Sequence, residues 1–308
     1  MTKLTDPIFT NEDAARAHFE AIRWPDGRIC PHCGSVDNSH LMQGKSTRPG
    51  LYKCRDCRKP FTATIGTIYE RSHIPLHKWL LATHLIVASK KGMSAKQLER
   101  MLGFGSYRTA WFMAHRIREA MKPTDNSPMG GDGGAVEADE TYIGRKKGKD
   151  AAVAGNAHKM AVLSLVERNT GQVRSFTIEN TRADEIHPII LSNIAREARL
   201  MTDEARMYWK IGKGFAAHGR TLHGRGEYVR GDIHSNTVEG FFSIFKRGMR
   251  GIYQHCGQHY LSRYLTEFDF RYCYREANGF NDADRAKVAI QGAVGRRLTC
   301  QQPHQRAS

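Results

Sequence analysis

Four cysteines near the start of the chain are spaced as two CxxC pairs, a pattern that binds metal. Cys30 and Cys33 lie in the run CPHCGS, and Cys54 and Cys57 lie in KCRDCRKPF. Each pair makes a tight turn that offers two thiolates, and two such turns complete a tetrahedral zinc site. A redox CxxC or an iron–sulfur site is the alternative, although a redox motif normally occurs once, inside a thioredoxin-like unit. Four protein ligands leave no open position, so we expect one structural Zn²⁺ ion.

Three carboxylates stand at positions where a sheet could gather them. Asp139 lies in a predicted strand, and Asp203 directly follows a short apolar strand. Glu239 lies on an amphipathic helix that we expect to begin near Asn236. Lys246 follows Glu239 by two helical turns, so both side chains project from nearly the same side of this helix. Each acid alone would be interpreted as an ordinary surface carboxylate, whereas the three together indicate a site.

The segments around these acids alternate between strand and helix patterns. Apolar or alternating runs joined by turn residues predict strands, and isoleucines at helical spacing predict a helix after the third strand. The fold class that fits this order is α/β, a mixed sheet flanked by helices. The predicted strands cover 135–144, 159–167, 172–178 and 199–202, and the predicted helices cover 183–198 and the segment from 236.

A helical region precedes the predicted sheet. The apolar spacing predicts a short helix over 94–103 and a longer one over 107–121, joined by a turn that contains glycine. This arrangement resembles a helix-turn-helix, with Arg108, Arg116 and Arg118 expected on the outside. Many three-helix units with arginines bind nothing, so this pattern leaves DNA binding open.

The clearest linker is PTDNSPMGGDGG, which has almost nothing apolar to bury. It separates the helical region from the predicted sheet and fixes the expected division of the chain. We expect an N-terminal helix and zinc ribbon over 1–70, a helix-turn-helix-like helical domain over 71–122, the linker over 123–134, an α/β domain over 135–290 and a mobile basic tail over 291–308.

The charge balance points to a polyanionic partner. The 308 residues carry a formal net charge of +16, and nucleic acid is the usual partner of so basic a chain. A merely soluble basic protein would show the same charge. No apolar run reaches the length of a membrane span, and the N-terminus lacks a secretory signal. We therefore expect no membrane association and a reducing cytoplasm in which the cysteines bind metal.

Several segments occur in a fixed order between about Trp24 and Tyr274. They are the CPHCGS and CRDC turns, VEADETYIG, MTDEARMY, HSNTVEGFFSIFKRGMRGIY and YLTEFDFRY. In this order they resemble the bacterial insertion-sequence transposases of the DDE superfamily, in the ISXO-like group. Members of this group carry an N-terminal zinc ribbon before an RNase H-like domain of the retroviral-integrase superfamily. The resemblance implies that the domain over 135–290 is an RNase H-like catalytic domain.

The resemblance also implies a chemistry. Asp139 matches the first catalytic aspartate of the family and Asp203 the second, while Glu239 matches the third carboxylate. Together they would hold two Mg²⁺ (or Mn²⁺) ions, since such ions prefer hard oxygen ligands. A phosphodiester at a transposon end would be hydrolysed to free a 3′-OH, and that strand would be transferred to target DNA.

The third position of the triad has more than one candidate. Glu239 is favoured because it gives a 35-residue interval from Asp203 and is followed after seven residues by Lys246, which matches the basic residue of the family. In part of the family this position is an asparagine, and Asn236 lies one turn earlier on the same face. Asp232 is a more distant choice.

The partners implied are double-stranded DNA, as inverted-repeat ends and as target, and further copies of the chain in a homo-oligomer on DNA. The protein would act in the cytoplasm, at the nucleoid. Basic residues that could contact DNA are Arg108, Arg116, Lys146, Lys147, Arg247 and Arg250. The alternative function is a catalytically silent zinc-ribbon and helix-turn-helix DNA-binding protein derived from a transposase. A general RNase H-like nuclease is a third interpretation.

Overall fold

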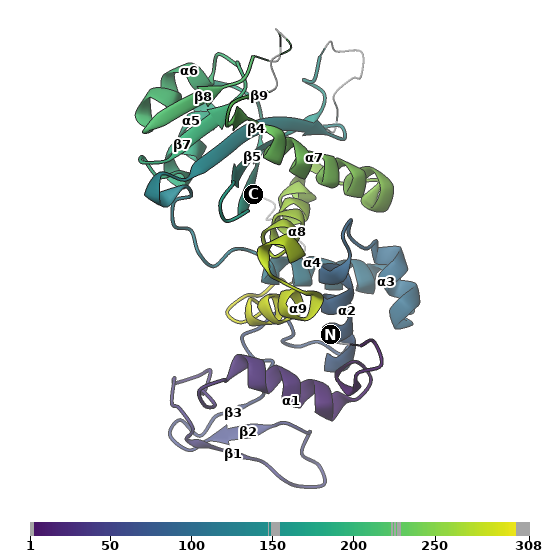
Figure 1. Ribbon diagram of the computed structural model, residues 1–308. Coiled ribbons are helices and arrows are strands. Elements are labelled where there is room, and N and C mark those ends of the chain that lie inside the picture. The colour runs from purple at the N-terminus through teal and green to yellow at the C-terminus, as the bar shows by residue number, and fades with distance from the viewer. Residues whose placement is uncertain are drawn as a thin grey trace, which may run out of the picture. The chain divides into compact units, whose positions relative to one another are not determined.

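The computed structural model describes residues 3–146, 148, 155–222, 224, 226 and 229–299 (Figure 1). Contacts between residues divide the chain into two units. Unit 1 consists of Met1–Ser89, Met93–Lys122 and Phe280–Ser308, and unit 2 consists of Lys90–Gly92 and Pro123–Gly279. Among the described residues, no helix has the length and apolar character that a membrane span needs.

The first part of unit 1 is a small three-stranded antiparallel sheet preceded by a helix. The helix begins after Asn11, whose side chain accepts hydrogen bonds from two backbone N–H groups of the first turn. The core of the sheet contains little more than Tyr52, Phe61 and two of the cysteines. So few apolar residues cannot stabilise a domain without a further crosslink. The elements are α1 (Glu12–Arg23), β1 (Ser39–Leu41), β2 (Tyr52–Cys54) and β3 (Pro60–Phe61).

The crosslink is provided by the four cysteines predicted to bind zinc. The Sγ atoms of Cys30 and Cys57 lie 3.7 Å apart, as do those of Cys33 and Cys54. All four Sγ atoms lie within 4.8 Å of one another. A tetrahedral site with Zn–S bonds of about 2.3 Å separates its sulfur atoms by about 3.8 Å. The spacing therefore fits a structural zinc ion that closes the ribbon.

The second part of unit 1 is a helical group. The short helix expected after Ser94 is present, and the Ser94 Oγ atom accepts a hydrogen bond of 3.1 Å from the Gln97 N–H group. It ends at Gly103, whose φ of 64° suits a residue without a Cβ atom. A last helix from the far end of the chain packs against α1, α2 and α4. The elements are α2 (Leu76–Ala88), α3 (Ala95–Leu102), α4 (Tyr107–Ala120) and α9 (Asp282–Gln291).

Two arginines of α4 are buried, although the sequence pattern predicted that they would be exposed. Arg116 and Arg118 were expected on the outside, but their exposed fractions are only 8% and 2%. The Arg116 guanidinium donates a hydrogen bond of 2.9 Å to the Glu70 carbonyl oxygen and lies 5.1 Å from the ring centroid of Trp79. The expectation is wrong because other parts of unit 1 cover this half of α4 on most sides. Arg108, in the first turn, is exposed.

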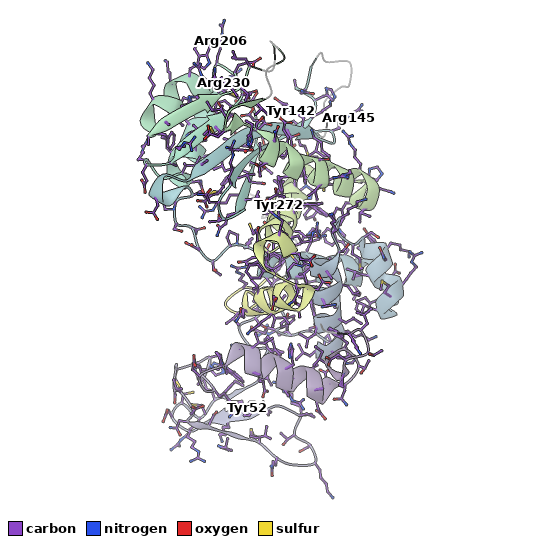
Figure 2. All side chains as sticks on the ribbon, in the orientation of Figure 1. Tyr52, Tyr142, Arg145, Arg206, Arg230 and Tyr272 are labelled. Carbon is purple, nitrogen blue, oxygen red and sulfur yellow. The ribbon has the colours of Figure 1, made fainter. Side chains whose placement is uncertain are left out.

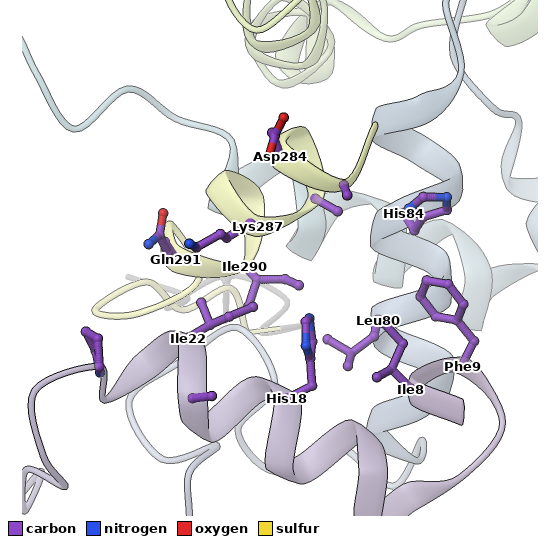
Figure 3. Close-up of a pocket in the computed structure, with 14 residues that line it drawn as sticks. Ile8, Phe9, His18, Ile22, Leu80, His84, Asp284, Lys287, Ile290 and Gln291 are labelled. Atoms are coloured by element: carbon purple, nitrogen blue, oxygen red, sulfur yellow. The ribbon is translucent and has the colours of Figure 1, made fainter. Parts of the chain in front are cut away.

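Helices α1, α2 and α9 surround a cavity of about 440 Å³ (Figure 3). Its walls are mostly apolar, with Ile22, Leu80 and Ile290 among them, and the rings of His18 and His84 also line it. Burial lowers the pKa of both histidines. Burial therefore favours the neutral form of both imidazole rings over the protonated form, compared with a histidine in water.

Residues 291–299, part of the segment expected to be a mobile tail, contact other parts of unit 1. Arg296 donates hydrogen bonds of 2.9 Å to the carbonyl oxygens of Glu119 and Ala120. Val294 forms an isolated bridge with Thr67. The rest of that segment lies outside the described residues. The five-part division of the chain stays a prediction.

Unit 2 is built on a five-stranded mixed sheet with the order β6-β5-β4-β7-β8. The strands β4, β5 and β6 are antiparallel neighbours, whereas β4, β7 and β8 run parallel. This mixed sheet is consistent with the RNase H-like fold that the resemblance implied. The strands are β4 (Ala135–Ile143), β5 (Met160–Glu167), β6 (Val173–Ile178), β7 (Arg199–Thr202) and β8 (Ala217–Arg220).

Each face of this sheet carries its own hydrophobic core. One core contains residues of α5 and α6, and the other contains residues of α7 and α8. Figure 1 shows α7 alongside β4 and β5. A two-stranded ribbon of β9 and β10 precedes α7. The elements are α5 (Ala183–Asn193), α6 (Tyr208–Ile211), β9 (Val229–Arg230), β10 (Ile233–His234), α7 (Asn236–Gly248) and α8 (Leu261–Cys273).

The sequence analysis did not predict the strand β8, and it predicted α5 to be longer than it is. The strand β8 has the sequence AHGR, which has neither an apolar run nor β-branched residues. It is a strand because β7 pairs with it in parallel register, a long-range contact that no local pattern reveals. The helix expected over 183–198 stops at Asn193, after which the Ala195 N–H group bonds to Met129 instead.

The zinc site makes a first prediction. We expect one zinc ion per chain in the purified protein, and Cys54→Ser should lose it, because a three-thiolate site binds zinc less tightly. Amide hydrogen exchange should then rise over residues 28–61, since metal binding supplies the folding free energy of such small modules. Cys256→Ser, outside the ribbon, is the matched control and should keep its zinc. A zinc-free ribbon with unchanged protection would contradict this role.

Candidate active site

The strand β4 presents acids on both faces of the sheet. Glu137 and Asp139 alternate with Ala138 and Glu140, so each pair projects to one side. Glu137 accepts a hydrogen bond of 2.9 Å from the Val238 N–H group in α7. Glu140 accepts one from the Tyr208 hydroxyl, which belongs to the other core. Asp139 therefore faces α7, and Glu140 points to the opposite face.

Asp203 reaches the same level of the sheet as Asp139. Glu137 is the register partner of Met201 in the parallel pair of β4 and β7. Asp139 lies two residues beyond Glu137 on β4, and Asp203 directly follows the end of β7, so the two acids lie at the same end of these paired strands. The Asp203 Oδ1 atom accepts a hydrogen bond of 2.9 Å from the Ala205 N–H group, which orients its carboxylate.

The start of α7 is tied to β4 through Glu137, which is fully buried. Its carboxylate accepts hydrogen bonds from the Thr237 hydroxyl at 2.8 Å and from the Arg168 Nε–H group at 2.5 Å. Arg168 also donates to the carbonyl oxygens of Asp232 and His234, in the segment just before the helix. A carboxylate at a helix N-terminus satisfies N–H groups that have no partner within the helix. These contacts fix the first turn of α7 over the strand that carries Asp139.

The acids influence one another electrostatically. The pKa of Asp139 is raised from its ordinary value of 3.8 to about 7. Burial is the main cause and the carboxylates of Asp203 and Glu239 add to it, whereas a hydrogen bond from the Glu140 N–H group and the charge of Lys246 oppose it. Burial likewise raises the pKa of Glu140 to about 8, with contributions from Asp139 and Asp203. The structure thus brings acids from β4, the end of β7 and α7 close enough to repel one another.

The two candidates for the third position both lie on exposed parts of α7. The Ser235 hydroxyl donates a hydrogen bond of 2.8 Å to the Glu239 carboxylate. Glu239 is near enough to Asp139 for its charge to raise the pKa of that group. Burial lowers the pKa of Lys246, and the nearby Asp139 counteracts this. Asn236 occupies the first position of the helix.

The acids are more widely spread than the cysteines. Within the part of the chain that the structure describes, only the four cysteines form a group of three or more metal-binding side chains with ligand atoms all within 4.8 Å of one another. Asp139, Asp203 and Glu239 therefore do not form a closed cage for a single small ion.

The basic candidates for DNA contact fall into different environments. Arg247 is exposed in the last turn of α7, and Arg250 is exposed in the helical segment that follows it. Lys146 donates a hydrogen bond of 2.6 Å to the Glu179 carbonyl oxygen and pairs with its carboxylate at 3.6 Å. Lys147 lies outside the described residues.

Sequence reasoning missed the groups that support the acids. Glu137 lies two residues before Asp139 on the same face, which the alternation of the strand could have revealed. Arg168 and Tyr208 had no local signal, because their partners are 31 and 68 residues away in the sequence. Glu137 and Arg168 hold the start of α7 against β4, and Tyr208 orients the carboxylate of Glu140.

Comparisons with known proteins agree with this architecture. A family model described as ISXO2-like transposase domain matches residues 132–272, and one described as transposase zinc-ribbon domain matches residues 10–60. Together they match more than half of the chain.

Individual proteins also match this chain, to different extents. A protein of Halobacterium salinarum, described as an uncharacterized protein in transposable element ISH50, is 27% identical over 281 residues, which are 85% of this chain and 91% of the relative. The cryoEM structure of the simian T-cell lymphotropic virus intasome in complex with PP2A regulatory subunit B56 gamma is 15% identical. That match covers 56% of this chain and 63%, less than two thirds, of the other, with a TM-score of 0.31, too low to indicate a common fold.

The two family matches cover both the ribbon and the sheet that the structure contains, and the relative belongs to a transposable element. The chain therefore belongs to the ISXO2-like DDE transposases of insertion sequences, in which a transposase zinc ribbon precedes an RNase H-like domain.

Proposed function

We propose that this transposase cuts DNA at transposon ends and joins the freed strand to target DNA, using Asp139, Asp203 and Glu239. The observation that carries the proposal is the convergence of these three acids, which come from separate elements and act on the pKa of Asp139. A fold alone does not need three acids that repel one another, so their proximity supports a site for cations.

The residues fit a pair of Mg²⁺ or Mn²⁺ ions. The donors are carboxylate oxygens, which such hard ions prefer. The acids are too widely spread to enclose one ion, and Asp139, Asp203 and Glu239 would together hold the pair of ions. Bound in this way, the ions would supply charge neutralisation at the entering and leaving oxygens of the phosphodiester.

The residues of the chain itself orient the acids and the DNA. The contacts of Glu137 hold the first turn of α7, which contains Glu239, against β4, and the Ala205 N–H group orients Asp203. Lys246 lies near Asp139, where its ammonium group can contact a phosphate next to the bond that is cut. Arg247 on the same helix and Arg250 just beyond its end are exposed and extend this basic surface.

The proposed partner is double-stranded DNA, both as inverted-repeat ends and as target. The net charge of +16 supports an electrostatic attraction that would weaken with salt. Two ends must be joined to one target, so the active form would be a homo-oligomer on DNA at the nucleoid. Arg108, exposed at the start of α4, stays a candidate contact. The buried Arg116 does not, because its guanidinium bonds to Glu70.

The runner-up function is a catalytically silent DNA-binding protein that retains the zinc ribbon and the helices. The intact set of Asp139, Asp203, Glu239 and Lys246 favours activity over this alternative. A general nuclease would share the acids, but it would cut DNA or RNA without preference for particular ends.

The first test is metal-dependent cleavage. With Mg²⁺ and a duplex that carries the inverted repeat flanking the gene, wild type should nick at the end, and Asp139→Asn should be slower by about 10²- to 10³-fold or more, because a group that neutralises transition-state charge is lost. Asp184→Asn changes an exposed acid of α5 and is the matched control. Equal cutting by wild type and Asp139→Asn would contradict the assignment, and no cutting by either would favour the silent protein.

A second test separates the candidates for the third acid. Glu239→Gln keeps the shape of the side chain but removes its charge, so end cleavage should be largely lost. Asn236→Ala changes an exposed residue at the first helical position and should keep most of the activity. The opposite ranking of the two variants in the same nicking assay would assign the position to Asn236.

The raised pKa of Asp139 predicts a pH dependence. Between about pH 4 and pH 7 the folded chain retains a proton on Asp139 that the unfolded chain has released. Without Mg²⁺, the stability of the zinc-loaded protein should therefore fall as pH rises through this window. Asp139→Asn should remove this part of the fall, so the difference in melting temperature between the variant and wild type should grow from pH 5 to pH 8. A constant difference would exclude the raised pKa.

A further inference from the structure

An exposed tryptophan lies next to the acidic site of unit 2. The helix α6 begins five residues after Asp203, and its first residue, Tyr208, points inward to Glu140. The next residue, Trp209, has half of its surface exposed to solvent. Its indole N–H group donates a hydrogen bond of 3.3 Å to the carbonyl oxygen of Glu204. The ring is therefore anchored to the residue that directly follows Asp203.

A guanidinium group accompanies this ring. Arg220 ends β8, where it is the register partner of Thr202, the residue before Asp203. Its Cζ atom lies 5.4 Å from the centroid of the Trp209 ring, within the range of a cation–π contact. The Arg230 Nη2 group donates a hydrogen bond of 3.2 Å to the Arg220 carbonyl oxygen. The position of Arg220 is thus set by the sheet on one side and by β9 on the other.

The surroundings of this pair are mainly basic. Figure 2 shows Arg206 and Arg230 at the end of unit 2 where α6 and β8 lie. Arg206 and Lys210 are exposed. Nearby acids include Asp203 and Glu204, and the Glu204 carboxylate accepts a hydrogen bond of 2.8 Å from the Gly224 N–H group. An exposed aromatic ring within basic side chains is the composition of surfaces that bind unpaired nucleotides.

We propose that Trp209 and Arg220 form a stacking site for one unpaired base of the DNA end, beside the phosphodiester that is cut. This inference rests on the proposed function and adds to it the state of the DNA. A bond inside a duplex reaches a site at a strand end more easily when the neighbouring base pair opens. The opened base loses its stacking neighbours, and an aromatic ring paired with a guanidinium replaces them.

A lone exposed aromatic residue would need no such explanation, because single apolar side chains are common on protein surfaces. What distinguishes Trp209 is its guanidinium partner and the hydrogen bond that fixes its indole edge to Glu204, the residue after Asp203. A base seated there would lie beside Glu204, the residue that follows Asp203.

The test uses the full-length zinc-loaded protein with Ca²⁺ in place of Mg²⁺. The probe is a single-stranded oligonucleotide that carries 2-aminopurine, whose fluorescence falls when it stacks, and a blunt duplex of the same sequence is compared with it. Trp209→Ala should weaken binding of the single strand by about tenfold, the order expected for one lost base–aromatic stack, with little change for the duplex. Trp209→Phe, which keeps a ring, should retain most of the binding and of the fluorescence quenching.

Two further measurements complete the test. Leu191→Ala removes an exposed apolar side chain of α5 and should bind like wild type, and thermal melting verifies that every variant is folded. In Mg²⁺, Trp209→Ala should cut a fully paired end slowly but regain its rate on an end with a mismatch beside the cut. Unchanged quenching and unchanged cutting by Trp209→Ala would overturn the stacking site and leave the transposase proposal intact. If wild type cuts no DNA, the proposed chemistry fails, and the 2-aminopurine binding still decides whether Trp209 stacks.

Discussion

A single buried carboxylate, that of Glu137, joins the sheet of unit 2 to the helix that carries the third acid. A buried charge without partners costs several kcal/mol, and here the partners come from α7 and from the turn after β5. The Arg168 guanidinium supplies the opposite charge, while Thr237 and Val238 donate hydrogen bonds. Breaking such a buried pair destabilises a protein by about 3–5 kcal/mol, so α7 has little freedom to slide along β4.

This anchor explains how acids far apart in the sequence can meet. Asp139 follows Glu137 by two residues on the strand, and Glu239 follows Thr237 by two residues on the helix. Glu239 therefore lies in the helical turn that Glu137 fixes over β4, which limits how far this acid can move from the strand of Asp139. The cost is a cluster of like charges in a poorly solvated place, where the pKa of Asp139 reaches about 7. Such a cluster differs from the ribbon, whose four thiolates saturate their ion and leave no room for a substrate.

Much of this architecture could be predicted because it depends on local patterns. The CxxC spacing, the apolar strands from β4 to β7 and the amphipathic face of α7 are all visible in neighbouring residues. The strand β8 was not predictable, because His218 and Gly219 have no strand preference and only the pairing with β7 makes them one. The buried Arg116 was misjudged for a similar reason. An arginine on a helix usually faces solvent, and only the fold shows that Trp79 and the Glu70 carbonyl cover it.

Unit 1 contains residues that precede unit 2 in the sequence and residues that follow it. Helix α9, from the part that follows, packs against α1, α2 and α4 from the part that precedes. The ribosome therefore makes the whole of unit 2 before it makes the last helix that unit 1 requires. Until then, the faces of α1 and α2 that α9 covers have no cover, while the sheet and α7 can already form. The order of synthesis thus lets the nuclease-like unit fold first and delays completion of the ribbon-bearing unit until translation has passed α9.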